Sequence, residues 1–206
     1  MNSRYAATFT FALAAVLLSG CSGEPGNATS TAPPPSSSAG PQFGAPSVPA
    51  PLDATALEKD PCAAMNADQV TSLGAPFKNT APQPDGATGP TCGWRFATDD
   101  GPSSVGGTVV TKDPSHSGLS GIYGQQKAGA LTKFEPFTVA GYPGVIYDPA
   151  SNSPAGLCTM TVGLRNDLTY VINVNLDSLK KPFADSCEVG KKVAGYVIQY
   201  LQKGGH

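Results

Sequence analysis

The strongest constraint on the fold is a pair of alternating apolar runs in residues 157–176, LCTMTVGLRNDLTYVINVNL. Alternation with a period of two predicts two antiparallel strands that share one apolar face. A two-residue turn at 166–167 would put the two apolar sets on opposite faces, because a one-residue change of register reverses every side chain. We therefore predict a three-residue loop over 165–167 that pairs Leu164 with Leu168, with Asn166 or Asp167 in the left-handed conformation. The predicted apolar face contains Cys158, Met160, Val162, Leu164, Leu168, Tyr170, Ile172, Val174 and Leu176, and the polar face contains Thr159, Thr161, Thr169, Asn173 and Asn175.

The carboxyl-terminal segment offers a cover for that apolar face. Asp185 is predicted to cap a helix from about Ser186 to Gln202. Apolar and small residues recur there at helical spacing, which gives the helix one apolar stripe. An antiparallel sheet covered on one face by helices is an α+β fold, and we predict it as a single domain over residues 54–206. The stripe contains Gly190, Val193, Ala194, Val197, Ile198 and Leu201.

Shorter elements are predicted ahead of the hairpin. The Asp-Pro-Cys sequence at 60–62 is typical of a helix start, and Asn66 with Gln69 forms a capping-box pattern. Residues 75–90 are rich in Pro and Gly and are predicted to be a loop. The other predicted elements are strands at 92–98 and 105–111 around a turn at 99–101, a helix over 118–131, and two strands within 134–148 around a turn at 141–144.

The amino terminus carries a targeting signal. Arg4 is followed by an apolar run over residues 6–18, which has the length of a signal-peptide core and is too short to span a bilayer comfortably. Leu-Ser-Gly at 18–20 then precedes Cys21, a pattern that resembles the lipobox of bacterial lipoproteins. We therefore expect residues 1–20 to be a signal peptide and Cys21 to be acylated, which would anchor the protein on the extracytoplasmic face of the cell membrane. An ordinary secretory signal with an incidental cysteine is the alternative.

The next segment differs in composition from both its neighbours. Residues 21–53 are rich in Pro, Ser and Gly and poor in apolar side chains. Such a segment buries too little apolar surface to offset the entropy of ordering the chain. We expect it to be a disordered tether between the lipid anchor and the folded domain.

Five cysteines is an odd number, and lipid attachment at Cys21 leaves four. In an exported domain these four are expected to form two disulfides, for which three pairings are possible. We favour Cys62–Cys92 and Cys158–Cys187, because the hairpin returns its second strand beside Cys158 and Cys187 follows a short loop later. Each bridge closes a loop of about 30 residues and contributes roughly 3 to 4 kcal/mol. Redox chemistry is the less favoured alternative, since the chain has no Cys-x-x-Cys motif.

Several short motifs follow one another in a familiar order. They are Asp-Pro-Cys at 60–62, Cys-Gly-Trp at 92–94, Val-Ala-Gly-Tyr-Pro at 139–143, Cys-Thr-Met-Thr-Val at 158–162 and Asp-Ser-Cys at 185–187. Together with the signal sequence and the tether, the set resembles the actinobacterial lipoproteins that carry domain of unknown function 3558. The resemblance covers about residues 55–203, and Gly144 departs from the Ala that usually follows Gly-Tyr-Pro there. It implies a cell-envelope protein and brings no established activity with it.

Composition and motif content exclude several classes of function. A formal net charge of −2 provides no basic surface for nucleic acid. The only histidines are His116, within Ser-His-Ser, and His206 at the end of the chain, and no spacing typical of a metal site or of paired catalytic carboxylates occurs. We interpret His116 as a surface-loop residue, because neighbouring residues rarely adopt the geometry of a triad. We therefore expect no cofactor, no metal and no catalytic residue.

A binding function fits the aromatic residues better. Trp94, Tyr123, Tyr142 and Tyr147 are predicted to line a pocket for a small apolar or lipidic ligand, although packing in the core is the simpler interpretation of the same side chains. These residues favour a non-catalytic binding or sensing module. The alternative is an accessory subunit that docks on another envelope protein through an exposed apolar patch and has no ligand pocket.

Overall fold

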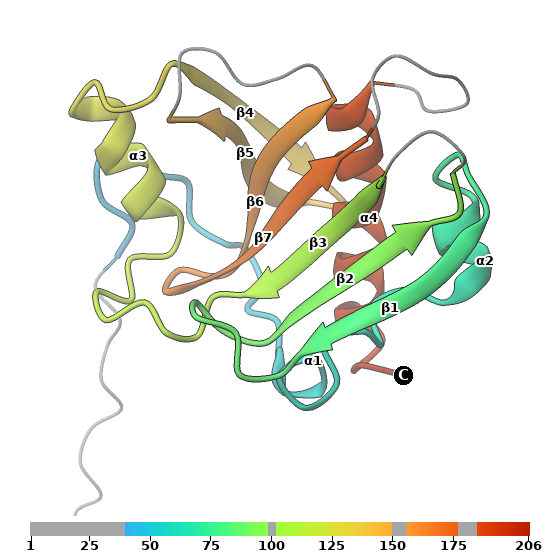
Figure 1. The fold of residues 1–206 in the computed structure, drawn as a ribbon. Helices are drawn as coiled ribbons and strands as arrows, with labels where there is room; N and C mark the ends of the chain where they lie inside the picture. The colour runs from blue at the N-terminus through green and yellow to red at the C-terminus, as the bar shows by residue number, and fades with distance from the viewer. Residues whose placement is uncertain (1–39, 99–101, 150–155, 177–184) are drawn as a thin grey trace, which may run out of the picture. The chain divides into compact units, whose positions relative to one another are not determined.

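Seven strands form one antiparallel sheet, and the fold is mostly sheet with a few helices. The computed structural model describes residues 40–98, 102–149, 156–176 and 185–206. The strands are β1 (Phe77–Gln83), β2 (Thr91–Phe96), β3 (Ser104–Val109), β4 (Lys133–Val139), β5 (Tyr142–Asp148), β6 (Leu157–Arg165) and β7 (Leu168–Asn175), and the helices are α1 (Thr55–Lys59), α2 (Ala67–Thr71), α3 (Leu119–Lys127) and α4 (Ser186–Gln202). The strands lie in the order β1-β2-β3-β7-β6-β5-β4, and every neighbouring pair is antiparallel (Figure 1).

The two edge strands each contain a proline. Pro82 lies in β1 and Pro136 in β4, where a missing backbone N–H is tolerated because one side of the strand has no partner strand. Proline at an edge also discourages pairing with another chain. The prediction of a loop over 75–90 is wrong for 77–83, which form β1. Its sequence, FKNTAPQ, lacks apolar alternation because an edge strand buries few of its side chains.

The β6–β7 hairpin has the predicted register along most of its length, but its turn differs from the prediction. Arg165 pairs directly with Leu168, so residues 166–167 form a two-residue turn. The register shifts between Gly163 and Arg165, which places a β-bulge at Leu164. The predicted three-residue loop is therefore wrong, as is the positive φ expected at Asn166 or Asp167. The bulge adds the extra residue within the strand, which keeps both apolar sets on one face.

The β4–β5 hairpin turns two residues earlier than expected. Val139 pairs with Tyr142, and the turn consists of Ala140 and Gly141, with φ values of 49° and 85°. Positive φ at both central positions is the geometry that matches the twist of paired strands. The predicted turn over 141–144 is wrong, because Tyr142 already belongs to β5.

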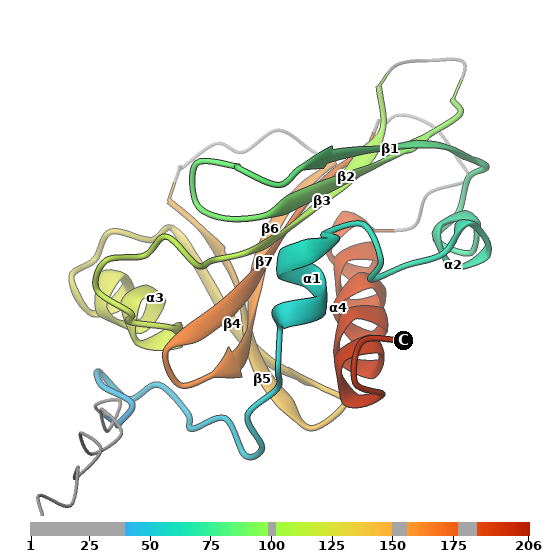
Figure 2. The same cartoon turned by 90° about the horizontal axis from the view of Figure 1, so that it is seen from below.

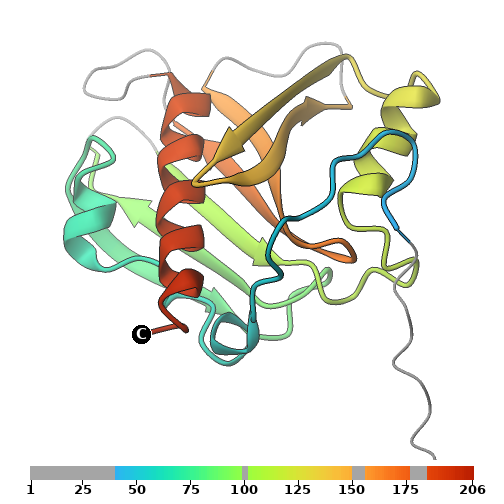
Figure 3. The same ribbon diagram turned by 180° about the vertical axis from the view of Figure 1, so that it is seen from behind.

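Helix α4 has the predicted bounds and cap. The Asp185 carboxylate accepts hydrogen bonds from the backbone N–H groups of Cys187 and Glu188. The helix packs against β6 and β7 and lies behind the sheet in Figure 1 and in front of it in Figure 3. A Cβ at Gly190 would lie 3.1 Å from Met160 Sδ, so glycine is what allows this close approach.

The short helices before the sheet differ in part from the prediction. Asn66 and Gln69 form the predicted capping box at the start of α2. Residues 60–62 do not start a helix: Asp60 follows the end of α1, and its carboxylate accepts a hydrogen bond from Cys62 N at 3.0 Å within a turn. The Asp60 side chain therefore stabilises one turn only. The next helix, α2, begins a few residues later at its own cap, Asn66.

The folded unit begins before residue 54. Residues 40–53, which the sequence assigned to the tether, run between α3 and α1 as the blue segment of Figure 2. Val48 N donates to Asn166 Oδ1 and Leu52 N donates to Leu164 O, both at 2.9 Å. Both apolar side chains are 7% exposed. This packing corrects the expected tether boundary; Cys21 and the predicted signal peptide lie outside the described residues.

Two disulfides connect helical or turn segments to the sheet. Cys62–Cys92 joins the turn after α1 to β2, and Cys158–Cys187 joins β6 to the first turn of α4. This is the pairing favoured from the sequence. The hydrophobic core contains the predicted apolar face of β6 and β7 and the apolar residues of the predicted stripe on α4.

Candidate functional site

A cleft of about 580 Å³ lies on the side of the sheet that faces away from the core. In β6 and β7 its lining residues Thr161, Thr169 and Val171 alternate with core residues. The loop over residues 113–118 forms one wall, and helix α3 forms the second. We call this site the threonine cleft; its lining residues are Thr88, Thr108, Val110, Asp113, Ser115, Ser117, Gly118, Gly121, Ile122, Gln125, Tyr147, Thr161, Thr169, Val171 and Asn173.

Three buried threonines from adjacent strands form the floor of the threonine cleft. Thr108 Oγ1 lies 2.9 Å from Thr91 Oγ1, and Thr161 Oγ1 donates to the backbone oxygen of Tyr170 at 3.3 Å. Thr169 is 6% exposed and lines the cleft, and its hydroxyl is not among the described buried atoms that lack a hydrogen-bond partner. The floor therefore presents hydroxyl groups with capacity left for a ligand.

Asp113 organises the loop that forms one wall of the cleft. Its carboxylate accepts hydrogen bonds from the backbone N–H and the hydroxyl of both Ser115 and Ser117, at 2.6 to 3.0 Å. The hydrogen bond from the Ser115 hydroxyl is the largest cause that lowers the pKa of Asp113 to about 2. His116 is exposed with a φ of 45°, as a tight loop requires. The Ser-His-Ser sequence thus shapes a loop around an aspartate.

Helix α3 is shorter than the predicted 118–131 and is held on the cleft side of the sheet. Gly118 precedes it with a φ of 53°. Tyr123 packs edge-on against Phe134 of β4, with ring centroids 5.0 Å apart. A Cβ at Gly163 would lie 3.1 Å from Leu119 Cδ1, so β6 and α3 approach closely there. These contacts fix the helix that forms the second wall.

The four aromatic residues predicted to bind a ligand are not gathered in one place. Trp94 and Tyr142 lie in the hydrophobic core, 0% and 4% exposed. Tyr123 contacts Phe134 from α3, and Tyr147 lines the threonine cleft. Burial raises the pKa of Tyr147, which keeps its hydroxyl protonated. The lining threonines were not proposed as site residues, although the sequence placed Thr161 and Thr169 on the face opposite the core.

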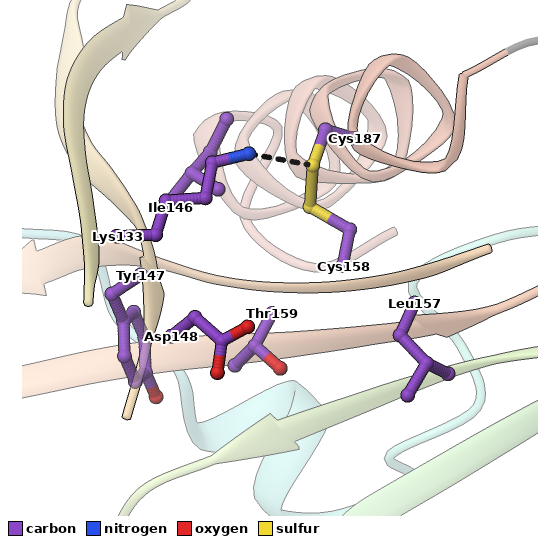
Figure 4. A pocket seen from close by; sticks show the side chains of 8 residues that line it. All are labelled: Lys133, Ile146, Tyr147, Asp148, Leu157, Cys158, Thr159 and Cys187. Atoms are coloured by element: carbon purple, nitrogen blue, oxygen red, sulfur yellow. Dashed lines mark hydrogen bonds between the residues drawn. A yellow bond between two sulfur atoms is a disulfide. The ribbon is translucent and has the colours of Figure 1, made fainter. Parts of the chain in front are cut away.

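A second, smaller cavity lies beside the Cys158–Cys187 disulfide (Figure 4). Lys133 Nζ approaches Cys187 Sγ at 3.9 Å, and Tyr147 lines this cavity as well. Its volume is about 70 Å³. That is room for about two water molecules and too little for a drug-sized ligand.

Within the described ranges, no three His, Cys, Asp or Glu side chains are grouped so that they could hold a metal ion. Among the same residues, no helix combines the length and apolar character needed to cross a membrane.

Comparison with known proteins identifies a family without an assigned activity. The model of the family described as protein of unknown function (DUF3558) matches residues 16–200, nearly the whole chain. No curated protein and no solved structure matches the chain. The chain therefore belongs to the DUF3558 family of proteins of unknown function.

Proposed function

We propose that this protein is a lipid-anchored binding module on the extracytoplasmic face of the cell membrane, which holds a small molecule in the threonine cleft without transforming it. The cleft itself is the observation that carries the proposal. Its volume of about 580 Å³ lies within the range of roughly 300 to 1,000 Å³ typical of small-molecule sites. Its floor consists of central strands of the sheet, which are rigid supports for a site.

The arrangement of the helices supports different roles for the two faces of the sheet, one in the core and one in ligand binding. In this proposal α4 and the short helices cover one face and complete the core. The opposite face then remains for ligand, with α3 as a wall. The hydroxyl-bearing side chains on that face contribute little to the core, so a binding role accounts for their placement.

Binding without catalysis is supported by the state of the acidic group in the cleft. Among the described lining residues, Asp113 is the one carboxylate, and both of its oxygens already accept hydrogen bonds from the neighbouring serines. A group held in this way is a poor general base. The described residues of the cleft contain no histidine or cysteine that would take its place.

The anchor rests on the sequence pattern ahead of Cys21. Gln42, near the start of the described chain, donates its backbone N–H to Ser120 Oγ of α3 at 2.9 Å. An anchored amino-terminal segment would therefore enter the folded unit beside a wall of the cleft. Mass analysis of the mature amino-terminal peptide from the native host tests this part. We expect a diacylated Cys21, and an unmodified Cys21 at the mature terminus would contradict the anchor.

The binding function is tested by native mass spectrometry of the full protein extracted from its own membranes. We expect a bound small molecule in the wild type and its loss in Val171→Trp, because the indole would fill the cleft. Asn175→Trp is the matched control, since Asn175 lies on the same face of β7 outside the cleft. Circular dichroism and thermal midpoints establish that both variants fold. Equal ligand content in the two folded variants would overturn the proposal.

A further inference from the structure

We infer that the threonine cleft selects an uncharged, hydroxyl-rich ring, that is, a neutral sugar, either free or as the headgroup of a glycolipid. The inference rests on the proposed function and names the ligand class of the same site. The aromatic residues led us to expect a small apolar or lipidic ligand. A neutral sugar is more polar than that, because the cleft contains few of those aromatic residues and many hydroxyl groups.

The hydrogen-bonding capacity of the floor points to a partner that both donates and accepts. Thr169 lines the cleft, and its hydroxyl is not among the described buried polar atoms that lack a hydrogen-bond partner. The hydroxyl is therefore open to the cleft, where it can donate to and accept from a ligand hydroxyl in place of water. The neighbouring Asn173 uses Oδ1 to accept from Thr159 Oγ1 at 3.2 Å, which leaves its amide N–H groups to donate. Sugar hydroxyls complement both kinds of group, since each donates and accepts.

Apolar surfaces lie between these polar groups. Val171 comes from β7, Val110 directly follows β3, Ile122 comes from α3, and Tyr147 contributes an aromatic ring. All four side chains are half-buried. A sugar ring has apolar C–H faces and polar edges, and aromatic side chains with a polar tip suit such amphipathic surfaces. Hydroxyl groups interleaved with apolar patches therefore match a sugar better than they match an alkyl chain.

The charge of the cleft argues against ionic ligands. Of the described residues that line it, none is Lys, Arg or His, so no cation is present to pair with a phosphate or carboxylate. Asp113 stays ionised and would repel an anion. Its oxygens are already occupied by Ser115 and Ser117, so it also has little capacity left to bind a cation.

The test is a binding screen with the full, acylated protein in detergent. One arm uses an array of free glycans that includes neutral, acidic and amino sugars. A second arm uses nanodiscs that contain either neutral glycosyl diacylglycerols or the same diacylglycerols without sugar, and a third uses palmitate.

Three variants are compared with the wild type. Thr169→Val removes a hydroxyl that lines the cleft at nearly constant shape, Val171→Trp fills the cleft, and Thr80→Val removes an exposed hydroxyl on β1 outside the cleft.

We expect neutral glycans, on the array or on the nanodiscs, to bind the wild type. Loss of one hydrogen bond should weaken binding about fivefold in Thr169→Val. Binding should disappear in Val171→Trp and stay unchanged in Thr80→Val. Binding on the array identifies a free glycan as the source, and binding on the nanodiscs alone identifies a glycolipid.

Three results would overturn the inference. Binding of palmitate or of acidic glycans that Val171→Trp abolishes would reject the neutral sugar and leave the proposed binding function intact. If no neutral glycan binds, or if neutral glycans bind equally well to folded Val171→Trp, the ligand class assigned to the cleft is wrong. Failure of the proposed function itself would be seen in the native mass spectra. Neither Val171→Trp nor Asn175→Trp would then change the amount of bound molecule.

Discussion

At the scale of single residues, position 107 requires glycine because the ring of Tyr170 packs directly against its backbone. Tyr170 is fully buried, and burial raises the pKa of its phenol well above the usual range. A Cβ at Gly107 would lie 2.6 Å from Tyr170 Cζ, which is within the ring's own volume. We therefore expect Gly107→Ala to lower the free energy of unfolding by about 1 to 3 kcal/mol. Urea denaturation measures the change.

Gly106→Ala is the matched control for this prediction. Gly106 is the preceding residue of β3 and faces the other side of the sheet, where a Cβ would lie 3.8 Å from its nearest neighbour, Asn173 O. It should change stability by much less than Gly107→Ala. Equal effects of the two substitutions would show that strand propensity, rather than the tyrosine, determines the requirement for glycine.

Asp113 provides a pH-dependent prediction at the same scale. Its folded-state pKa of about 2 lies below the ordinary value of 3.8, so ionisation of Asp113 stabilises the fold. That stabilisation is fully present above about pH 5 and is lost as the pH falls through the folded-state pKa. We expect Asp113→Asn to lower the thermal midpoint at pH 6 and to have little effect at pH 2.

Thermal melts of both proteins from pH 2 to pH 7 measure this difference. Because Asp113 is partly exposed, solvent screening should keep the effect small. A difference between the two midpoints that is constant across the range would show that the serine hydrogen bonds do not depend on the charge of the carboxylate.

At the scale of elements, the sequence predicts best where one element carries its own complete signal. Helix α4 has a cap at Asp185 and an apolar stripe, and its predicted bounds agree with the structure. Strand β1 carries no such signal, since an edge strand with Pro82 has little alternation to detect. The bulge at Leu164 was also missed, because a sequence specifies which side chains must share a face but not how the backbone achieves it.

The Cys158–Cys187 disulfide connects α4 to the sheet, which gives a prediction at this scale. The two cysteines are 29 residues apart in sequence. Removing a bridge over a loop of that length should lower the free energy of unfolding by about 3 to 4 kcal/mol in the chain-entropy model. Urea denaturation of Cys158→Ala/Cys187→Ala measures the loss. A loss below about 1 kcal/mol would mean that side-chain packing holds α4 against the sheet without help from the disulfide.

At the scale of the whole molecule, the candidate site could be predicted only in part. The alternation in 157–176 placed Thr161, Thr169 and Asn173 on a polar face, and that face is the floor or rim of the cleft. The walls could not be foreseen, because they come from α3 and from the Asp113 loop, which are distant in sequence from the hairpin. Of the aromatic residues, Trp94 and Tyr142 pack in the core, which was the simpler interpretation, and Tyr147 lines the cleft.

The most direct test of the account is a crystal structure of the protein purified from its own membranes without denaturation. We predict electron density in the threonine cleft for a hydroxylated ring within hydrogen-bonding distance of Thr169 Oγ1 and Asn173. An empty cleft, together with a copurified molecule bound elsewhere on the protein, would contradict the central claim that this face of the sheet is the binding site.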